Sequence, residues 1–199
     1  MDRIENLPEG PITGDGPVSQ EFLRRGVAAF HDACRYVHQL PYGYNANRDD
    51  PMSLFAEGKG TCTTKHAVIA LLAQELGLPV GKAVGIYAMT EELVTGTNRI
   101  LREFRLPYVP MIHCFLQAGE RRVDLTEGNR NGKNRSIEDF LYTQTVQPAI
   151  RERDEYLLYR RALEDLILRR EEMRGIDLLT VLRAREQSLK LLRRNIGAP

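Results

Sequence analysis

The sequence places one cysteine where its thiol can act as a nucleophile. Cys62 lies in the run GKGTCTTKH (58–66), where two glycines lead directly into an apolar segment that ends before Gly77. This pattern predicts a centrally buried helix over 62–76 with Cys62 at its start. The unpaired N–H groups and the positive dipole end of a helix start stabilise a thiolate. Cys62 is therefore the candidate nucleophile.

Two residues downstream, His113 and Asp124, complete the set that a Cys-His-Asp mechanism requires. Alternating patterns predict strands over 108–117 and 121–125, joined by a tight turn at 118–120. If Ala118 pairs with Arg121, His113 and Asp124 lie diagonally on one face, with Cα atoms about 7–8 Å apart. Asp124 can then accept a hydrogen bond from one ring nitrogen of His113, and the other nitrogen faces Cys62.

These segments resemble the transglutaminase-like superfamily of papain-type cysteine enzymes. The resemblance covers about residues 25–130 and includes an aromatic segment before the cysteine, at 42–45, similar to one in bacterial members. The other matching pieces are Gly60-Thr61-Cys62 at the helix start, LGLPV at 76–80, His113 on a later strand, and Asp124-Leu125-Thr126 where the family often has Asp-Pro-Thr.

The resemblance implies an α+β fold, with the cysteine helix packed on an antiparallel sheet that carries the histidine and the aspartate. It implies that Cys62 is the nucleophile, that His113 is the general acid and base, and that Asp124 orients His113. The family frequently has an aromatic residue after the histidine and a Trp that helps to hold the oxyanion. Here Cys114 follows His113 and the chain has no Trp.

The oxyanion donor is therefore open at this stage. The backbone N–H of Cys62 is one candidate, and the hydroxyls of Tyr44 and Tyr42 are two others. His66 follows Cys62 by one helical turn and is a further candidate at the site, either for the substrate or as part of the site wall. A zinc site that uses His66 is disfavoured because no compact second pair of ligands accompanies it.

Other residues of the same types have less context. Cys34 and Cys114 lie in apolar patterns and are expected to be core residues, and His31 and His38 are expected to make local hydrogen bonds on a helix. Lys59 and Lys65 either solvate the loop and the helix start or lower the pKa of the nearby thiol. These alternatives remain open from the sequence alone.

The remaining segments suggest three parts: an irregular arm (1–18), a catalytic core (19–148) and a helical C-terminal extension (149–199) packed on the core. Within them we predict several elements from Pro, Gly and apolar spacing. These are a helix over 19–39 capped by Ser19, a short helix over 51–55, a strand over 80–89, an insertion over 90–107 with a short helix near 100–104, a short helix begun by Ser136, and a helical hairpin broken near Gly175.

Composition excludes several classes of protein. With 42% apolar and 28% charged residues, the 199-residue chain has the balance of a globular domain and not of a disordered one. A net charge of +1 gives no reason to expect nucleic acid or membrane partners. Three cysteines without framework spacing predict free thiols, and the absence of a secretory pattern predicts a cytoplasmic protein. We expect no cofactor and no metal.

The function predicted from these residues is a cysteine-dependent amide or ester hydrolase or acyl transferase with a thioacyl intermediate. Its substrate would be a peptide, a protein or a small amide. The alternative is a non-catalytic binding or scaffolding domain that keeps the fold. An arylamine N-acetyltransferase-like enzyme ranks lower, because the Arg-Gly-Gly run those enzymes carry before their cysteine is missing. Polar flanks at 43–59 and 127–135 favour hydrolysis over amine transfer.

Overall fold

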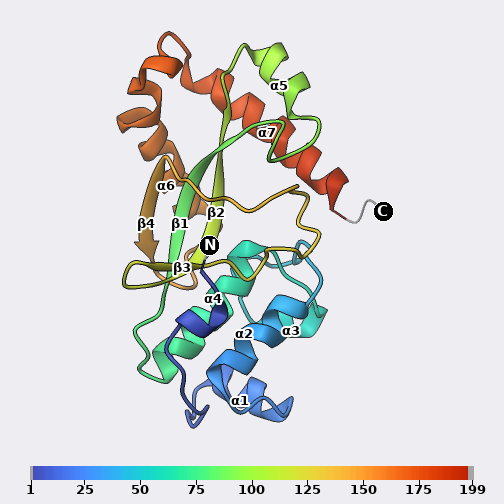
Figure 1. Cartoon of the computed structure of the whole chain (residues 1–199), viewed down its shortest axis with the longest axis vertical. Helices are drawn as coiled ribbons and strands as arrows, with labels where there is room; N and C mark the ends of the chain where they lie inside the picture. Colours follow the sequence, from blue (N-terminus) through green and yellow to red (C-terminus); the bar gives the residue numbers. More distant parts are fainter. Residues whose placement is uncertain (1, 197–199) are drawn as a thin grey trace.

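The computed structural model describes residues 2–196 and is built on a four-stranded antiparallel sheet with strand order β3-β2-β1-β4 (Figure 1). The two long central strands are β1 (Gly81–Met89) and β2 (Val109–Ala118), and the shorter edge strands are β3 (Arg121–Val123) and β4 (Tyr142–Val146). Together with the helices this is the mixed α+β fold that the sequence predicts. The central strands are almost fully buried because helices cover them.

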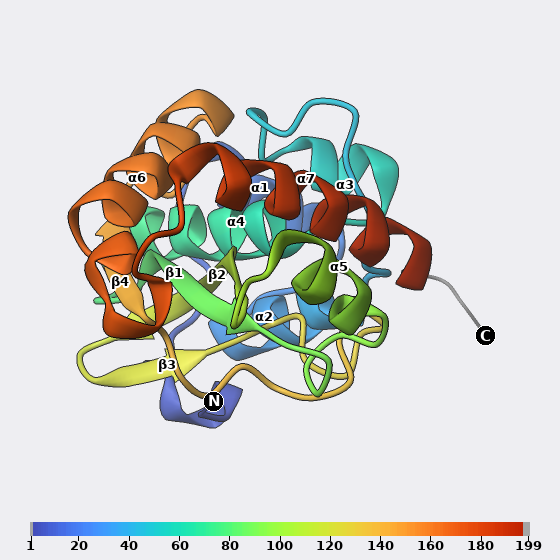
Figure 2. The same ribbon diagram turned by 90° about the horizontal axis from the view of Figure 1, so that it is seen from above.

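The helices gather in two groups along the central strands (Figure 1), and Figure 2 shows the same ribbon from above, where the two groups overlap. The N-terminal group packs around one apolar core, which also includes Leu116 and Val123 of the sheet. The C-terminal group encloses a second core near the other end of β1 and β2. The N-terminal group is α1 (Pro17–Arg24), α2 (Phe30–Gln39), α3 (Ser53–Glu57) and α4 (Cys62–Glu75), and the C-terminal group is α5 (Thr97–Phe104), α6 (Glu152–Asp165) and α7 (Leu178–Asn195).

Helix α4 lies where the sequence predicts a central helix. It begins at Cys62 and ends at Glu75, and Gly77 follows with a φ of 66°, a left-handed conformation that glycine adopts without strain. Eleven of its fourteen residues are buried, which agrees with its apolar character on all sides. Because α4 packs against β1 and β2, its first residue is held against the sheet.

The single helix predicted over 19–39 is wrong, since two helices occupy this region. α1 begins at Pro17, so Ser19 is an interior residue and not the N-cap. The chain turns at Gly26, whose φ of 74° is incompatible with a continuous helix. The first turn of α1 is capped from α4, because the Glu75 carboxylate accepts hydrogen bonds from the N–H groups of Val18 (3.0 Å) and Ser19 (2.7 Å). A cap supplied by tertiary structure is invisible in the local sequence.

The helix predicted to begin at Ser136 is also absent. Residues 136–140 form no regular element, and the chain then pairs with β1 as strand β4, which the sequence reading missed. The run Tyr-Thr-Gln-Thr-Val of β4 is rich in residues that favour strands, so its β-propensity was the available signal. Its polar residues suit an edge strand that is largely solvent-exposed on one side.

The other predicted elements occur with shifted ends. The short helix expected over 51–55 is α3, the helix expected near 100–104 begins earlier as α5, and the break near Gly175 is a longer segment with two 3-10 turns, Ile167–Arg169 and Glu171–Met173. The N-terminal segment contains one 3-10 turn, Ile4–Asn6. Strand β3 ends at Val123, so Asp124 follows the strand instead of lying in it.

Gly85 gives a test of how tightly the sheet is packed. It pairs with His113 across β1 and β2, and a Cβ atom at this position would lie 2.2 Å from Cδ1 of Phe140. Phe140 in turn packs on Phe115, with ring centroids 4.9 Å apart. We expect Gly85→Ala to lower the free energy of unfolding by about 1–3 kcal/mol, as over-packing does, measured by urea denaturation. Gly81→Ala is the control, because its Cβ would be at an ordinary 3.6 Å from Thr145, and an equal loss in both variants would contradict the explanation.

Candidate active site

The glycine loop before α4 fixes the position of the Cys62 thiol. Gly58 ends α3 with a φ of 62°, and Gly60 lies so close to α4 that a Cβ atom would be 2.7 Å from Thr64 Oγ1 and 2.9 Å from Leu54 Cδ1. Only glycine allows this approach. The side chain of Cys62 is almost buried, with 8% of the residue exposed, and it is the first residue of the helix.

Tyr42 is brought to Cys62 by a short backbone pairing. Residue 42 forms a parallel bridge with Gly60, and the Gly43 N–H donates to the Gly60 carbonyl at 3.3 Å. Asn45 anchors the same segment by donating to the Lys59 carbonyl at 3.0 Å. As a result, the Tyr42 hydroxyl lies 3.9 Å from the Cys62 sulfur and is oriented to donate to it. Burial raises the pKa of Tyr42 well above its usual value, so the hydroxyl stays protonated.

His113 and Asp124 are brought together by the hairpin. The pairs Ala118–Arg121, Gln117–Arg122 and Leu116–Val123 confirm the predicted register as far as the strand extends. His113 Nε2 lies 2.7 Å from Asp124 Oδ2, and both side chains are buried. The other carboxylate oxygen of Asp124 accepts from the backbone N–H of Thr126 at 2.8 Å and from its hydroxyl at 2.7 Å. The carboxylate is held on both sides, and Nδ1 is the nitrogen of His113 that Asp124 does not engage.

The charges of the site favour a thiolate and an imidazolium. Burial lowers the pKa of His113, but the charges of Asp124 and Cys62 outweigh it and raise the pKa to about 9. Burial raises the pKa of Asp124, and the charge and hydrogen bond of His113 reverse this and hold it far below its usual value. The pKa of Cys62 is well below its usual value because of hydrogen bonding with Cys114 and the positive charges of His113 and Lys133, despite its burial.

Comparison with known proteins places the chain in a family. The family model of the transglutaminase-like superfamily matches residues 10–117, more than half of the chain. The chain belongs to the transglutaminase-like superfamily. The matched region contains Cys62 and His113 and ends before Asp124. No curated protein and no solved structure matches the chain.

Cys114, the residue after His113 in this member of the superfamily, is a buried neighbour of Cys62. Its sulfur lies 3.8 Å from Thr63 Oγ1 and 3.7 Å from Glu155 Oε2, and it shares a small apolar cluster with Cys62 and Val84. Hydrogen bonding to Cys62 and burial raise its pKa well above the usual value. Cys114 therefore keeps its proton and stabilises a negative charge on the Cys62 sulfur. No local sequence pattern indicates this contact, because only the packing of α4 on β2 creates it.

His66 is buried behind the site, and both of its nitrogens are occupied. Nδ1 lies 2.7 Å from the Cys62 carbonyl oxygen, and Nε2 lies 2.8 Å from the Leu125 backbone nitrogen, which is a donor. The ring is therefore protonated on Nδ1, and burial lowers its pKa to about 4. Its hydrogen bonds tie α4 to the segment that carries Asp124. Among residues 2–196, no group of three or more His, Cys, Asp or Glu side chains could hold a metal ion.

The two lysines near the thiol have different surroundings. Lys65 is fully buried, and its Nζ donates to the carbonyls of His38 (3.2 Å) and Leu40, so it ties α2 to α4. Burial lowers its pKa to about 8. Lys59 pairs with Glu57 at 3.6 Å on the surface. The lysine whose charge acts on Cys62 is Lys133, which lies in a polar loop and was not predicted.

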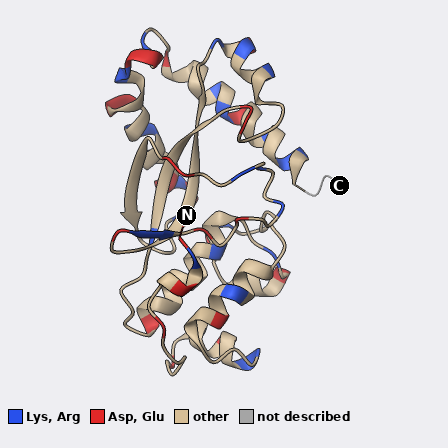
Figure 3. Cartoon of the chain, in the orientation of Figure 1, with Lys and Arg blue, Asp and Glu red and all other residues tan. Residues whose placement is uncertain are grey.

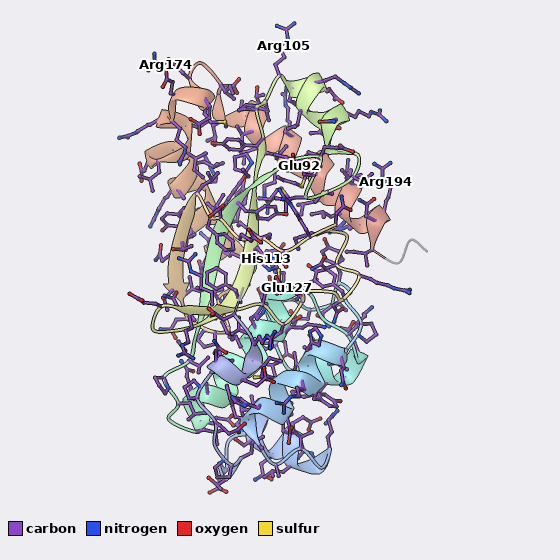
Figure 4. All side chains as sticks on the ribbon, in the orientation of Figure 1. Glu92, Arg105, His113, Glu127, Arg174 and Arg194 are labelled. Atoms are coloured by element: carbon purple, nitrogen blue, oxygen red, sulfur yellow. The ribbon has the colours of Figure 1, made fainter. Side chains whose placement is uncertain are left out.

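A cavity of about 170 Å³ is lined by Cys62 and His113. Figure 4 shows His113 near the middle of the molecule, between the two helix groups. Tyr44, with 39% of its surface exposed, lines the cavity beside Tyr42. The sequence reading missed most of the other lining residues because they come from distant segments. These include Arg48, Tyr87, Met111, Asn131, Lys133, Glu152 and Glu155, together with Arg185, Leu189, Leu192 and Arg193 of α7 and Ile196 directly after it.

No helix among residues 2–196 has the length and apolar character that crossing a membrane requires.

The pKa shifts predict how the reaction depends on pH. Turnover should rise with pH as Cys62 loses its proton, stay high across neutral pH, and fall above about pH 9, when His113 loses the proton that the leaving group needs. Alkylation of Cys62 by iodoacetamide should not show the fall above pH 9, because it requires the thiolate alone. In His113→Ala the rise of the alkylation rate should move to higher pH, because one of the groups that lower the pKa of Cys62 is lost, and an unchanged profile would contradict the assigned ion pair.

Proposed function

We propose that the protein is a cysteine-dependent amide or ester hydrolase or acyl transferase. The Cys62 sulfur attacks the carbonyl carbon of the substrate and forms a C–S bond, while His113 Nδ1 gives its proton to the departing amine or alcohol. In the second half, His113 takes a proton from water or an acceptor amine, which attacks the thioester and releases Cys62. Asp124 accepts from Nε2–H and holds the His113 ring in both its charged and its neutral form. The observation that carries this proposal is the 2.7 Å contact between His113 and Asp124 beside a cavity that also contains Cys62.

Tyr42 is the best candidate for the oxyanion donor, together with the backbone N–H of Cys62. Its hydroxyl is protonated and lies 3.9 Å from the Cys62 sulfur, which is close to where the oxygen of a tetrahedral intermediate would develop. Tyr44 is more exposed, and Arg193 stacks on its ring at 4.6 Å. The engaged nitrogens of His66 leave it no free donor for this role. The hydroxyl of Tyr42 would then take the oxyanion-holding role that a Trp frequently has in the family, in a chain that contains no Trp.

Electrophilic probes and product analysis test the proposal together. A panel of amide and ester probes should label Cys62 before the buried Cys34 and Cys114, and mass spectrometry of peptides would locate the adduct. With a turned-over amide and a primary amine present, we expect the free acid to exceed the amine adduct. The reason is that the cavity is lined by charged side chains which do not exclude water. Equal labelling of all three cysteines would contradict the proposed nucleophile, and mainly amine adducts would show acyl transfer instead.

A further inference from the structure

The cavity that contains Cys62 is more positive than the chain as a whole. Besides the opposite charges of Cys62 and His113, four cationic side chains line it, namely Arg48, Lys133, Arg185 and Arg193, against only two acidic ones, Glu152 and Glu155. The net charge of the entire chain is +1. The excess of positive charge is therefore local, and it is concentrated where a substrate would bind.

The two acidic residues are both engaged by Arg48 in the cavity wall, so one negative charge remains against the other three cations. Arg48 Nη2 forms an ion pair with the buried Glu155, and its Nη1 lies 3.3 Å from Glu152. Arg48 lies in the loop before α3, and both carboxylates lie at the start of α6, so the ion pairs join these two segments. Arg48 is thus committed to protein carboxylates. The other three cations have no carboxylate partner among the described residues.

Arg185 is held at the cavity wall without a hydrogen-bond partner for its Nε. This atom is buried and unpaired among residues 2–196, and the guanidinium stacks on Tyr159 at 5.0 Å and on Tyr156 at 5.7 Å from the ring centroids. Stacking positions the guanidinium but leaves its N–H donors free. A partly buried cation without an anion is costly, and an anionic ligand would remove that cost.

Lys133 and Arg193 also lie over aromatic rings, as Arg185 does. Lys133 lies over the ring of Tyr42 at 5.9 Å, and Arg193 lies over the ring of Tyr44 at 4.6 Å. Arg185 and Arg193 are two turns apart on α7, so one face of this helix carries both into the wall of the cavity. Figure 3 shows Lys and Arg recurring along α7. Aromatic side chains thus position all three free cations around the reactive thiol.

We propose that Lys133, Arg185 and Arg193 form a binding site for an anionic group, a carboxylate or a phosphate, on the substrate that Cys62 attacks. The inference rests on the proposed function for its substrate and deepens it by naming the substrate class. The anion occupies the cavity beside the thiol and pairs with the three free cations. A neutral amide of the same size lacks this interaction.

Two alkylating reagents of nearly equal size test this site. Iodoacetate is anionic and iodoacetamide is neutral. The measured quantity is the alkylation rate of Cys62 with iodoacetate divided by its rate with iodoacetamide, because any change in the thiolate fraction affects both rates equally. We expect this ratio to fall about fivefold in Lys133→Gln and in Arg185→Gln, because each variant removes one attractive charge, and to fall with added salt in the wild type. Arg193→Gln, at an exposed position, should act in the same direction without risk to folding. Arg194→Gln is the matched control, since Arg194 is next in sequence, points outward in Figure 4 and does not line the cavity.

Protection experiments identify the anion. At constant ionic strength, succinate and inorganic phosphate are each compared with neutral succinamide as inhibitors of labelling by iodoacetamide. Protection by succinate alone assigns a carboxylate, and protection by phosphate alone assigns a phosphate. Rate ratios in Lys133→Gln, Arg185→Gln and Arg193→Gln equal to that of Arg194→Gln, or protection by neither anion, would overturn the anion site. Failure of iodoacetamide to label Cys62 at all would instead overturn the proposed function.

Discussion

Replacing Cys62 by Ala is expected to abolish amide or ester turnover, with a loss of about 10⁴-fold or more, because no other group can form the thioacyl intermediate. The variant should fold normally, since the side chain loses only its sulfur atom at the edge of a cavity. Turnover of the best substrate from the probe screen is the measurement, and circular dichroism confirms the fold.

The other two cysteines give matched controls for this experiment. Cys34 is fully buried in the N-terminal core, so Cys34→Ala removes a thiol without touching the site and should keep its activity. Cys114→Ala removes a hydrogen-bond donor from the Cys62 sulfur and should raise the pKa of Cys62. Its turnover near neutral pH should fall, and part of the loss should return at higher pH. Full activity in Cys62→Ala would exclude the covalent mechanism.

Replacing Asp124 by Asn is expected to reduce turnover by about 10³–10⁴-fold with the fold intact. In the wild type, Asp124 Oδ2 accepts from His113 Nε2, which leaves Nδ1 to exchange a proton with Cys62. In the variant, the asparagine can still accept from Thr126 with its oxygen, as Oδ1 does now. Its NH₂ group then faces Nε2 and forces this nitrogen to be an acceptor. The proton moves to Nδ1, which can no longer take a proton from the thiol or the attacking water.

A second Asp→Asn substitution, away from the site, is the control for the negative charge that Asp124→Asn removes. Asp139 is exposed and lies in the irregular segment before β4, so Asp139→Asn removes the same charge without altering a hydrogen bond to His113. We expect wild-type turnover in this control. The pH profile of turnover also distinguishes loss of a charge from loss of the hydrogen bond to His113. Asp124→Asn should lose the decrease near pH 9 that is due to His113, and Asp139→Asn should keep it. Equal turnover in both variants would show that Asp124 does not orient His113.

The parts of the site that follow from local rules could be predicted from the sequence. The Gly58 to Cys62 loop and the apolar run behind it specify the start of α4, and the Gly119 turn sets the register that brings His113 near Asp124. Helix ends, tight turns and strand alternation depend on neighbours within a few residues. The missed turn at Gly26 had a local signal in its glycine, which with its neighbours closes the helix end through hydrogen bonds to Phe22 and Leu23. The missed strand β4 had only its β-propensity as a signal, and pairing with the distant strand β1 places it.

What the sequence alone determined is the set of candidate residues Cys62, His113 and Asp124 and the elements on or beside which they lie. Only the tertiary structure decided the surroundings of those residues: Cys114 beside the thiol, Tyr42 paired through Gly60, and Lys133 with two arginines of α7 around the cavity. These contacts join segments far apart in the chain, and they depend on how α4 and α7 pack against the sheet. Packing of this kind is set by the fit of many side chains at once, so no local pattern encodes it.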